Sequence, residues 1–305
     1  MSLHLGLDLG GTNIKCAVLE RPGEPGALPR VLATASTPTR SEDGADAVLG
    51  RVAALGRATA APLGDVATVG VGLPGHFDAA TGTATLLPNL HGDWRGQPVA
   101  GPLAAALGRP VALVNDCRAL TLAELRLGAG RGVDDLLCIA LGTGVGGGVA
   151  IGGRLHLGLG HAGELGHQTV DPGGPVCGCG NRGCLDRVAG AEAIARDAGR
   201  ATVDEVATAA RAGDARAIAA LERAAELIGT ALANAIVVLW PERVVVGGGV
   251  AAAGAALLDP LRAVIHRRAC VAPTDRIAIV PAALGPHAGA TGAALFAAEA
   301  GPPAT

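Results

Sequence analysis

A cluster of cysteines constrains this chain more than any other feature. Three of the seven cysteines, Cys177, Cys179 and Cys184, fall within eight residues of a stretch that runs from Gly160 to Asp186. Glycine and proline fill much of this stretch, so no regular helix or strand is expected to run through it. A long irregular segment inside a compact domain needs something to hold it in place, and such segments are often functional.

Three thiolates and one imidazole make a closed tetrahedral zinc site, which is the interpretation that we favour. The expected fourth ligand is His167, with His161 as the second choice. A closed site has no open position for water, so the zinc is expected to be structural and to place two neighbouring acids, Glu164 and Asp186. Two other interpretations stay open: a disulfide, which the short spacing of these cysteines disfavours, and three buried inert thiols.

Composition excludes several classes of function. Half of the 305 residues are hydrophobic, but only two Trp and two Phe occur and Tyr is absent, so the core is expected to consist of Ala, Val and Leu. Few aromatics and a net charge of -3 argue against nucleic-acid binding. No long apolar run indicates a membrane span, and a strand pattern from His4 leaves no room for a signal peptide. A soluble cytoplasmic protein with reduced cysteines is expected.

Hydrophobic periodicity predicts that strands and helices occur along the whole chain. Strand patterns, two of them doubled around a glycine turn, occur at residues 4–20, 31–37, 67–75, 111–117, 135–153, 244–251 and 276–283. Helix patterns occur at residues 42–60, 99–107, 119–128, 187–240 and 289–300. The segment 76–96 lacks periodicity and is predicted to be a loop.

The two doubled strand patterns each close on a glycine–threonine turn, at residues 10–13 and 142–144. This weak repetition is expected of a duplicated domain. Backbone N–H groups of glycine-rich turns bind phosphate without a lysine, so we favour nucleotide phosphate binding over two ordinary tight turns. Two G-x-G-x-x-G segments, at 70–75 and 142–147, lack the strand and helix context of a dinucleotide site.

Together these motifs resemble a known superfamily. The first phosphate motif of the sugar kinase, hsp70 and actin superfamily is similar to LGLDLGGTNIKCAV, its second phosphate motif to LGTGVGGGVAIGG, and its adenosine motif to VVVGGGVA. Within the superfamily, the signature of the ROK family (repressors, open reading frames and sugar kinases) resembles AGELGH followed by CGCGNRGCLD. The resemblance extends from His4 to the last helix pattern.

The resemblance implies a two-domain α/β fold of the actin-like ATPase (ribonuclease H-like) type with an interdomain cleft. It implies a smaller N-terminal domain of residues 1–116 and 290–305, and a larger C-terminal domain of residues 117–289 with the zinc-binding loop. The implied activity is an ATP- and Mg²⁺-dependent hexokinase that phosphorylates a hexose, with glucose as the first choice, at its primary hydroxyl to give glucose 6-phosphate. A homodimer is also implied.

The family's functional residues are carried over by the same resemblance. The implied catalytic base is Asp116, whose position alone fits a helix N-cap equally well. Implied sugar contacts are Gly75, Asn89, Asn115, Glu164, His167 and Asp186. Implied contacts to ATP and Mg²⁺ are Asp8, Gly10, Gly11, Thr12, Asn13, Thr143, Gly144, Gly247 and Gly248. Implied zinc ligands are His167, Cys177, Cys179 and Cys184. Asp186 stands where the family usually has the longer Glu.

Other functions stay open at this point. The acceptor sugar is fructose, mannose, N-acetylglucosamine or N-acetylmannosamine in one alternative. A non-catalytic ROK sugar sensor is a second, but an intact Asp116 and both phosphate turns speak against it, and about seven residues before Asp8 leave no room for the DNA-binding region of ROK repressors. A third alternative, an actin-like or chaperone-like ATPase, has no need of the cysteine cluster.

Overall fold

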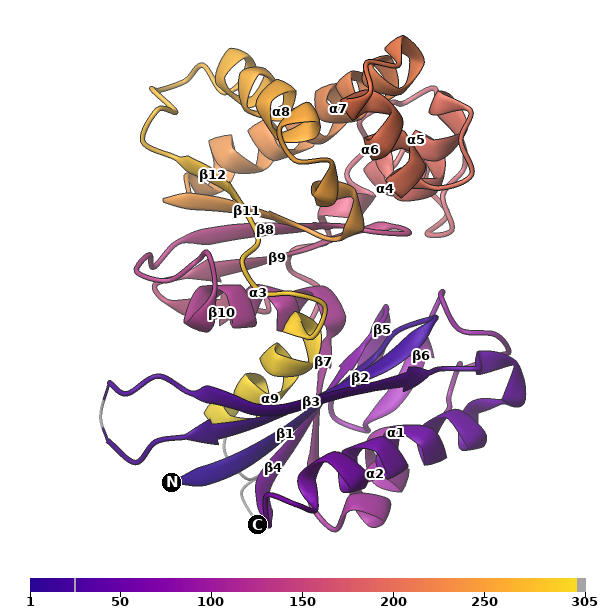
Figure 1. Cartoon of the computed structure of the whole chain (residues 1–305), viewed down its shortest axis with the longest axis vertical. Coiled ribbons are helices and arrows are strands. Elements are labelled where there is room, and N and C mark those ends of the chain that lie inside the picture. Colours follow the sequence, from indigo (N-terminus) through magenta and orange to yellow (C-terminus); the bar gives the residue numbers. More distant parts are fainter. Residues whose placement is uncertain (25, 301–305) are drawn as a thin grey trace. The chain divides into compact units, whose positions relative to one another are not determined.

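The computed structural model describes residues 1–24 and 26–300, and the chain forms two compact α/β units (Figure 1). The first unit contains residues 1–131 and the segment that begins at residue 283, and the second contains residues 132–282. The sequence analysis placed these boundaries after residues 116 and 289. They lie elsewhere because the helix that begins at Asp116 packs against the C-terminal helix of the first unit.

The first unit is built on a five-stranded sheet with the order β3-β2-β1-β4-β7. Strands β1 (Ser2–Leu9), β2 (Asn13–Arg21) and β3 (Arg30–Pro38) are antiparallel neighbours. Strands β4 (Val66–Leu73) and β7 (Val111–Asn115) continue the sheet in parallel with β1. The carboxyl ends of β1, β4 and β7 therefore meet at one edge of the sheet.

Helices cover both faces of this sheet. Side chains alternate along a strand, and in β1 Leu5 and Leu7 point toward Gly56 of α1, whereas Gly6 lies against α9. A Cβ at Gly6 would overlap the carbonyl of Ala290, so glycine lets the helix backbone approach the sheet closely. The helices of the first unit are η1 (Ser41–Asp43), α1 (Ala45–Ala60), α2 (Ala100–Leu107), α3 (Asp116–Leu127) and α9 (Ala288–Ala300).

A small hairpin occupies part of the segment that was predicted to be a loop. It is formed by β5 (His76–Asp78) and β6 (Thr83–Leu86), which pair with an irregular register. Strands of three and four residues are too short to produce a recognisable alternation in the sequence. The loop prediction for residues 76–96 is therefore wrong at these two strands.

The second unit contains a sheet of the same plan, with the order β10-β9-β8-β11-β12. Strands β8 (Leu136–Leu141), β9 (Val145–Ile151) and β10 (Arg154–His156) are antiparallel neighbours, and β11 (Arg243–Gly247) and β12 (Ala278–Pro281) continue in parallel with β8. Two antiparallel strands, a central strand and two parallel strands thus occur in both units. This common plan agrees with the weak repetition in the sequence.

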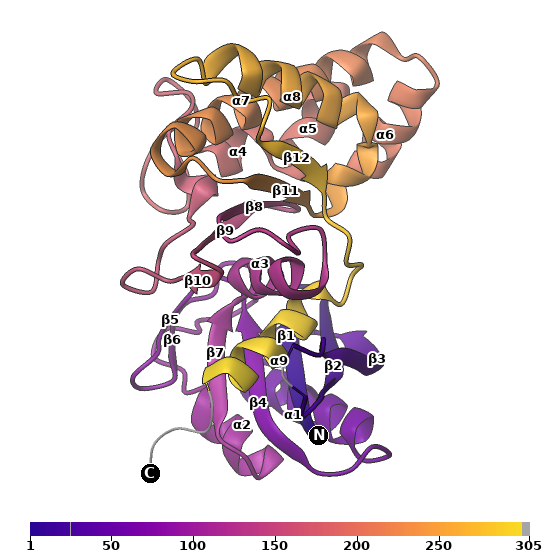
Figure 2. The same cartoon turned by 90° about the vertical axis from the view of Figure 1, so that its left-hand side faces the viewer.

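The helical stretch predicted at residues 187–240 consists of four helices, of which α7 packs against α8 (Figure 2). The core of this unit is aliphatic, as the composition predicted. In the described part of the chain, no helix is both long and apolar enough to cross a membrane. The helices of the second unit are η2 (Leu165–His167), α4 (Leu185–Ala189), α5 (Ala191–Ala198), α6 (Val203–Arg211), α7 (Ala215–Leu239), η3 (Gly249–Ala253) and α8 (Ala255–Arg268).

A buried carboxylate fixes the two segments that link the units. Glu124 of α3 is fully buried. Its carboxylate accepts hydrogen bonds from the backbone N–H groups of Ala129 at 2.7 Å, Ala283 at 3.1 Å and Leu284 at 2.8 Å. Ala129 lies shortly before the chain leaves the first unit, and the other two lie where it returns. One side chain therefore holds both crossing segments within the first unit.

Replacement of this carboxylate is expected to destabilise the first unit strongly. In Glu124→Ala, three backbone N–H groups lose their acceptor in a buried place, which costs roughly 3 kcal/mol of unfolding free energy. Glu299→Ala is the matched control, because its ion pair with Arg126 is partly exposed and such pairs contribute about 1 kcal/mol or less. Urea unfolding measures both, and equal losses in the two variants would contradict the role of Glu124.

Candidate functional site

The first glycine turn, Gly10–Asn13, joins β1 to β2 and is held from outside. Within the turn, the N–H of Gly10 donates to the carbonyl of Asn13 at 3.1 Å. Thr39, which is buried just beyond β3, donates its hydroxyl to the carbonyl of Gly10 at 2.6 Å and its N–H to the carbonyl of Thr12 at 2.9 Å. Thr39 was not predicted from the sequence. A threonine that follows a strand has no local sequence signal to show that it bonds to a turn remote in the chain.

The segment that carries Asn89 packs against this turn. A Cβ at Gly11 would come within 2.6 Å of the Asn89 carbonyl oxygen, so only glycine allows this approach. The side chain of Asn89 is exposed. Gly75 has a φ of +98°, and a Cβ there would overlap the carbonyl of Leu86. The structure therefore brings Gly75 and Asn89 together with the first turn in one unit.

The pair Asn115–Asp116 lies where β7 ends and α3 begins. Asn115 is the N-cap: its Oδ1 accepts hydrogen bonds from the N–H groups of Cys117 at 3.0 Å and Arg118 at 3.3 Å. Its Nδ2 donates to the carbonyl of Gly75 at 3.2 Å. Asp116, which is half-buried in the first turn of α3, also accepts a hydrogen bond at its Oδ1 from the N–H of Cys117 at 2.7 Å.

Asp8 is the second carboxylate of this group. Burial and the negative charge of Asp116 raise the pKa of Asp8 to about 7, and the nearby Lys15 acts in the opposite direction. Two glycines leave room for the carboxylate of Asp8: a Cβ at Gly289 would come within 2.6 Å of Oδ2, and one at Gly72 would contact Oδ1 at 3.5 Å. Two acids so placed attract a divalent cation, whose hard charge prefers carboxylate oxygens.

The second glycine turn, between β8 and β9, belongs to the second unit. The N–H of Gly142 donates to the carbonyl of Gly144 at 2.8 Å, and the N–H of Val145 donates to Oδ1 of Asp186 at 2.7 Å. Gly248, which follows β11 with a φ of +88°, packs directly on the backbone of Leu141. The end of β11, where the adenosine motif lies, is therefore next to the second turn.

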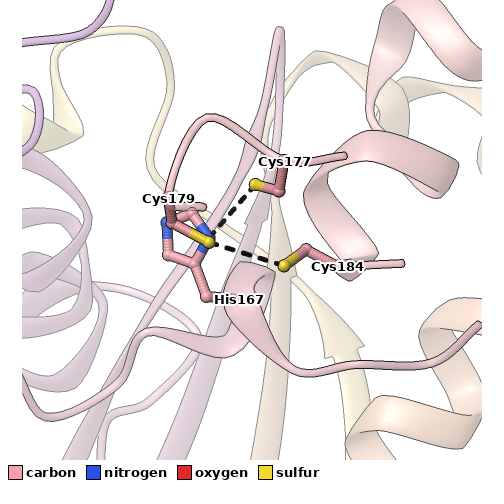
Figure 3. Close-up of side chains that lie close together, drawn as sticks. All are labelled: His167, Cys177, Cys179 and Cys184. Carbon is pink, nitrogen blue, oxygen red and sulfur yellow. Dashed lines mark hydrogen bonds between the residues drawn. The ribbon is translucent and has the colours of Figure 1, made fainter. Parts of the chain in front are cut away.

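The four expected metal ligands form one cluster (Figure 3). The ligand atoms of His167, Cys177, Cys179 and Cys184 lie within 4.8 Å of one another. Sγ of Cys177 is 3.7 Å from Nδ1 of His167, and Sγ of Cys179 is 3.6 Å from Sγ of Cys184. A sulfur–sulfur distance of 3.6 Å excludes a disulfide bond between the latter pair, and all seven cysteines are free.

The donor set of this cluster fits a zinc ion. Zinc–ligand bonds of about 2.0–2.3 Å in a tetrahedron place the ligand atoms about 3.5–3.8 Å apart, close to the observed separations. Burial and the two neighbouring thiols raise the pKa of Cys184 to about 12, so without a metal this thiol disfavours the thiolate form. A bound divalent cation reverses this preference. His161, the second choice as a ligand, is not part of the cluster among the described residues.

Glu164 lies on the other side of the same imidazole. His167 has Nδ1 on the side of Cys177, and its Nε2 is 4.0 Å from Oε2 of Glu164. Both side chains are about one-third exposed, at 36% and 31%. Histidine ligands of metals commonly have a carboxylate near the second ring nitrogen, which sets the orientation of the ring. Glu164 and His167 therefore present polar atoms to solvent beside the cluster.

The structure groups the expected site residues by unit. The first unit contains Asp8, the first turn, Gly75, Asn89, Asn115 and Asp116. The second unit contains the second turn, Gly247, Gly248, Glu164, Asp186 and the cysteine cluster.

Comparisons with known proteins agree with this arrangement. A family model described as "ROK family" matches residues 4–300. The chain is 36% identical over 281 residues to a glucokinase of Thermotoga maritima, with 85% of each chain covered, and 33% identical to a glucokinase of Streptomyces coelicolor, with 99% of each covered. A solved ROK family glucokinase from Streptomyces griseus, in complex with glucose and AMPPNP, superposes with a TM-score of 0.84 at 33% identity, covering 98% of this chain and 100% of that one.

The fold class that the sequence predicted is thereby confirmed, since these neighbours have the actin-like ATPase fold. The family model matches residues 4–300, which is nearly the whole chain. The chain belongs to the ROK family.

Proposed function

We propose that this protein is a sugar kinase that transfers the γ-phosphoryl group of ATP to the primary hydroxyl of glucose, giving glucose 6-phosphate. The observation that carries this proposal is the placement of Asp116: a carboxylate at the start of α3, fixed by the Asn115 cap and electrostatically coupled to Asp8. Relatives at 33–36% identity that are glucokinases, together with the glucose and AMPPNP complex of a similar structure, support glucose as acceptor and ATP as donor.

In the first unit, we assign the proton transfer to Asp116. Its carboxylate accepts the proton of the primary hydroxyl as the hydroxyl oxygen attacks the γ-phosphorus in line, and the bond from the γ-phosphorus to the bridging oxygen breaks so that ADP leaves. Asp8 would hold Mg²⁺ directly or through water, and this ion would supply positive charge against the phosphates. The first turn binds phosphate through backbone N–H groups. Asn89, and the second N–H of the Asn115 amide, are proposed to contact the sugar.

In the second unit, we assign sugar hydroxyls to Glu164 and His167, because both present polar atoms beside the cluster. Asp186, whose Oδ1 accepts a hydrogen bond from the N–H of Val145, is not assigned a sugar hydroxyl here. Thr143 and Gly144 are proposed to bind phosphate, and Gly247 and Gly248 to lie against the adenosine. The cysteine cluster with His167 is proposed to hold one structural zinc ion.

The proposed reaction is tested by sugar-dependent ADP release from ATP over a panel of sugars. Wild-type protein is expected to release ADP with glucose, and Asp116→Asn is expected to lose at least about a thousandfold in kcat, because the amide cannot accept the proton. Asp46→Asn, at an exposed acid in α1 of the same unit, is the control and should keep normal turnover. ADP release that does not depend on any sugar would contradict the kinase.

The zinc ion is tested by metal analysis of the purified protein. We expect one zinc per chain in wild-type protein, and loss of zinc with a lower melting temperature in Cys179→Ser, because three ligands do not close the site. Cys270→Ser is the control, since Cys270 is also exposed and belongs to the same unit but lies outside the cluster. Equal zinc content in the two variants would contradict the proposed ligand set.

The raised pKa of Asp8 predicts a pH dependence of stability. The pKa of Asp8 is about 7 in the folded protein, above its usual value of 3.8, so the folded state keeps a proton that the unfolded chain releases. The unfolding free energy therefore falls as the pH rises from about 4 to about 7. Asp8→Asn removes this loss. The unfolding free energy of Asp8→Asn minus that of wild type should be roughly 2–4 kcal/mol larger at pH 8 than at pH 4.

Urea unfolding without Mg²⁺ at the two pH values measures this difference. A difference in unfolding free energy between Asp8→Asn and wild type that is the same at pH 4 and pH 8 would contradict the raised pKa of Asp8.

A further inference from the structure

We propose that Asp186 is a positioning residue for the second glycine turn, and thereby for the phosphates of the nucleotide, and that it does not bind the sugar. The inference rests on the proposed kinase function, because it takes the turn between β8 and β9 as a phosphate-binding element. It assigns a role to a position at which this chain departs from the longer Glu that is usual in ROK sequences.

The carboxylate of Asp186 lies directly on the turn. Asp186 is the second residue of α4, and its half-buried Oδ1 accepts a hydrogen bond from the N–H of Val145 at 2.7 Å. A Cβ at Gly144 would overlap the same oxygen, closer than real Cβ atoms ever approach. Glycine at 144 therefore serves a second purpose besides the phosphate approach, since it leaves the space that the Asp186 carboxylate fills.

Helix α4 contacts the turn with its other end as well. The N–H of Ala191, just after α4, donates to the carbonyl of Gly142 at 2.9 Å. A Cβ at Gly190 would lie 2.9 Å from the carbonyl oxygen of Thr143, so this glycine also permits close packing. These contacts are made by backbone atoms, and Asp186 adds the side-chain contact. The turn is thus held by Asp186 of α4 and by Gly190 and Ala191 at the junction of α4 and α5.

This arrangement determines which N–H groups can meet a phosphate. The N–H of Gly142 is bonded to the carbonyl of Gly144, and the N–H of Val145 is bonded to Asp186. Phosphate recognition therefore falls to the N–H groups of Thr143 and Gly144. Donors that are already fixed bind an anion without a further ordering cost, so loss of the Asp186 contact should weaken nucleotide binding.

The role requires a hydrogen-bond acceptor but not a negative charge. A carboxylate close to bound phosphates repels them, whereas its bond to Val145 holds their donors in place. An amide at position 186 keeps the acceptor oxygen and removes the charge. A residue that binds the sugar behaves differently. Its carboxylate accepts hydrogen bonds from sugar hydroxyls, and these hydrogen bonds become weaker when the carboxylate is replaced by a neutral amide.

The test uses calorimetric titration of the full-length protein with Mg²⁺–AMPPNP alone and with glucose alone. Asp186→Asn should keep the AMPPNP Kd within about twofold of wild type or tighten it, and Asp186→Ala should raise it about tenfold. The glucose Kd should stay unchanged in both variants. Asp204→Ala, at an exposed acid in the same unit, controls for loss of a charge.

A second variant pair tests the contact itself. Gly144→Ala should displace the Asp186 carboxylate and weaken AMPPNP binding as Asp186→Ala does. The double variant Gly144→Ala/Asp186→Ala should bind AMPPNP no more weakly than either single variant, because both substitutions remove the same contact. Melting temperature and zinc content confirm folding. If one of these variants fails to fold, Asp186→Asn is sufficient by itself to distinguish a positioning role from sugar binding.

Loss of glucose affinity in Asp186→Asn with intact AMPPNP affinity would overturn the proposal, and so would an unchanged AMPPNP Kd in Asp186→Ala. Additive effects in the double variant would also overturn it. Failure of the kinase proposal is recognised separately, because wild-type protein would then neither bind AMPPNP nor release ADP in the presence of glucose.

Discussion

The convergence of one imidazole and three thiols in the second unit is the constraint on which the proposed zinc site depends. Between β10 and α4 the described backbone contains one short 3-10 helix and two isolated bridges, at Thr169–Cys184 and Val176–Arg182. The other backbone hydrogen bonds of this segment close turns and do not form a regular helix or sheet. The four side chains of the cluster have their ligand atoms within 4.8 Å of one another. The proposed zinc ion would hold the two ends of the segment together and would thereby fix the positions of the polar groups beside the cluster.

The cluster is connected to the second glycine turn by two short backbone paths. Cys184 immediately precedes α4, whose ends contact the turn. His167 ends the 3-10 helix in which Gly166 packs on the carbonyl of Val145 so closely that a Cβ would overlap it. The same turn residue therefore meets both metal-bearing segments. The second turn contacts these segments through close approach of backbones at glycine and not through bulky side chains. The same kind of contact occurs where α9 packs on the sheet of the first unit.

Much of the fold and the metal cluster could be predicted from the sequence, because local patterns encode them. Alternating apolar residues marked the longer strands, and the dense Cys-x-Cys-x4-Cys spacing marked the ligands. The contacts that were missed are long-range. Thr39 and Glu124 bond to backbone groups remote in sequence, and the role of the helix cap at Asn115 depends on where β7 ends. The limits of the two compact units depend on helix packing, such as that of α3 on α9, which leaves no local mark in the sequence.

The central claim is that a zinc ion with three sulfur ligands and one imidazole holds the segment that carries Glu164 and His167. X-ray absorption at the zinc edge of the purified protein tests it directly. The account predicts three sulfur neighbours at about 2.3 Å and one nitrogen neighbour at about 2.0–2.1 Å, with no water ligand. Absence of zinc, or a shell of oxygen and nitrogen neighbours without sulfur, would contradict it.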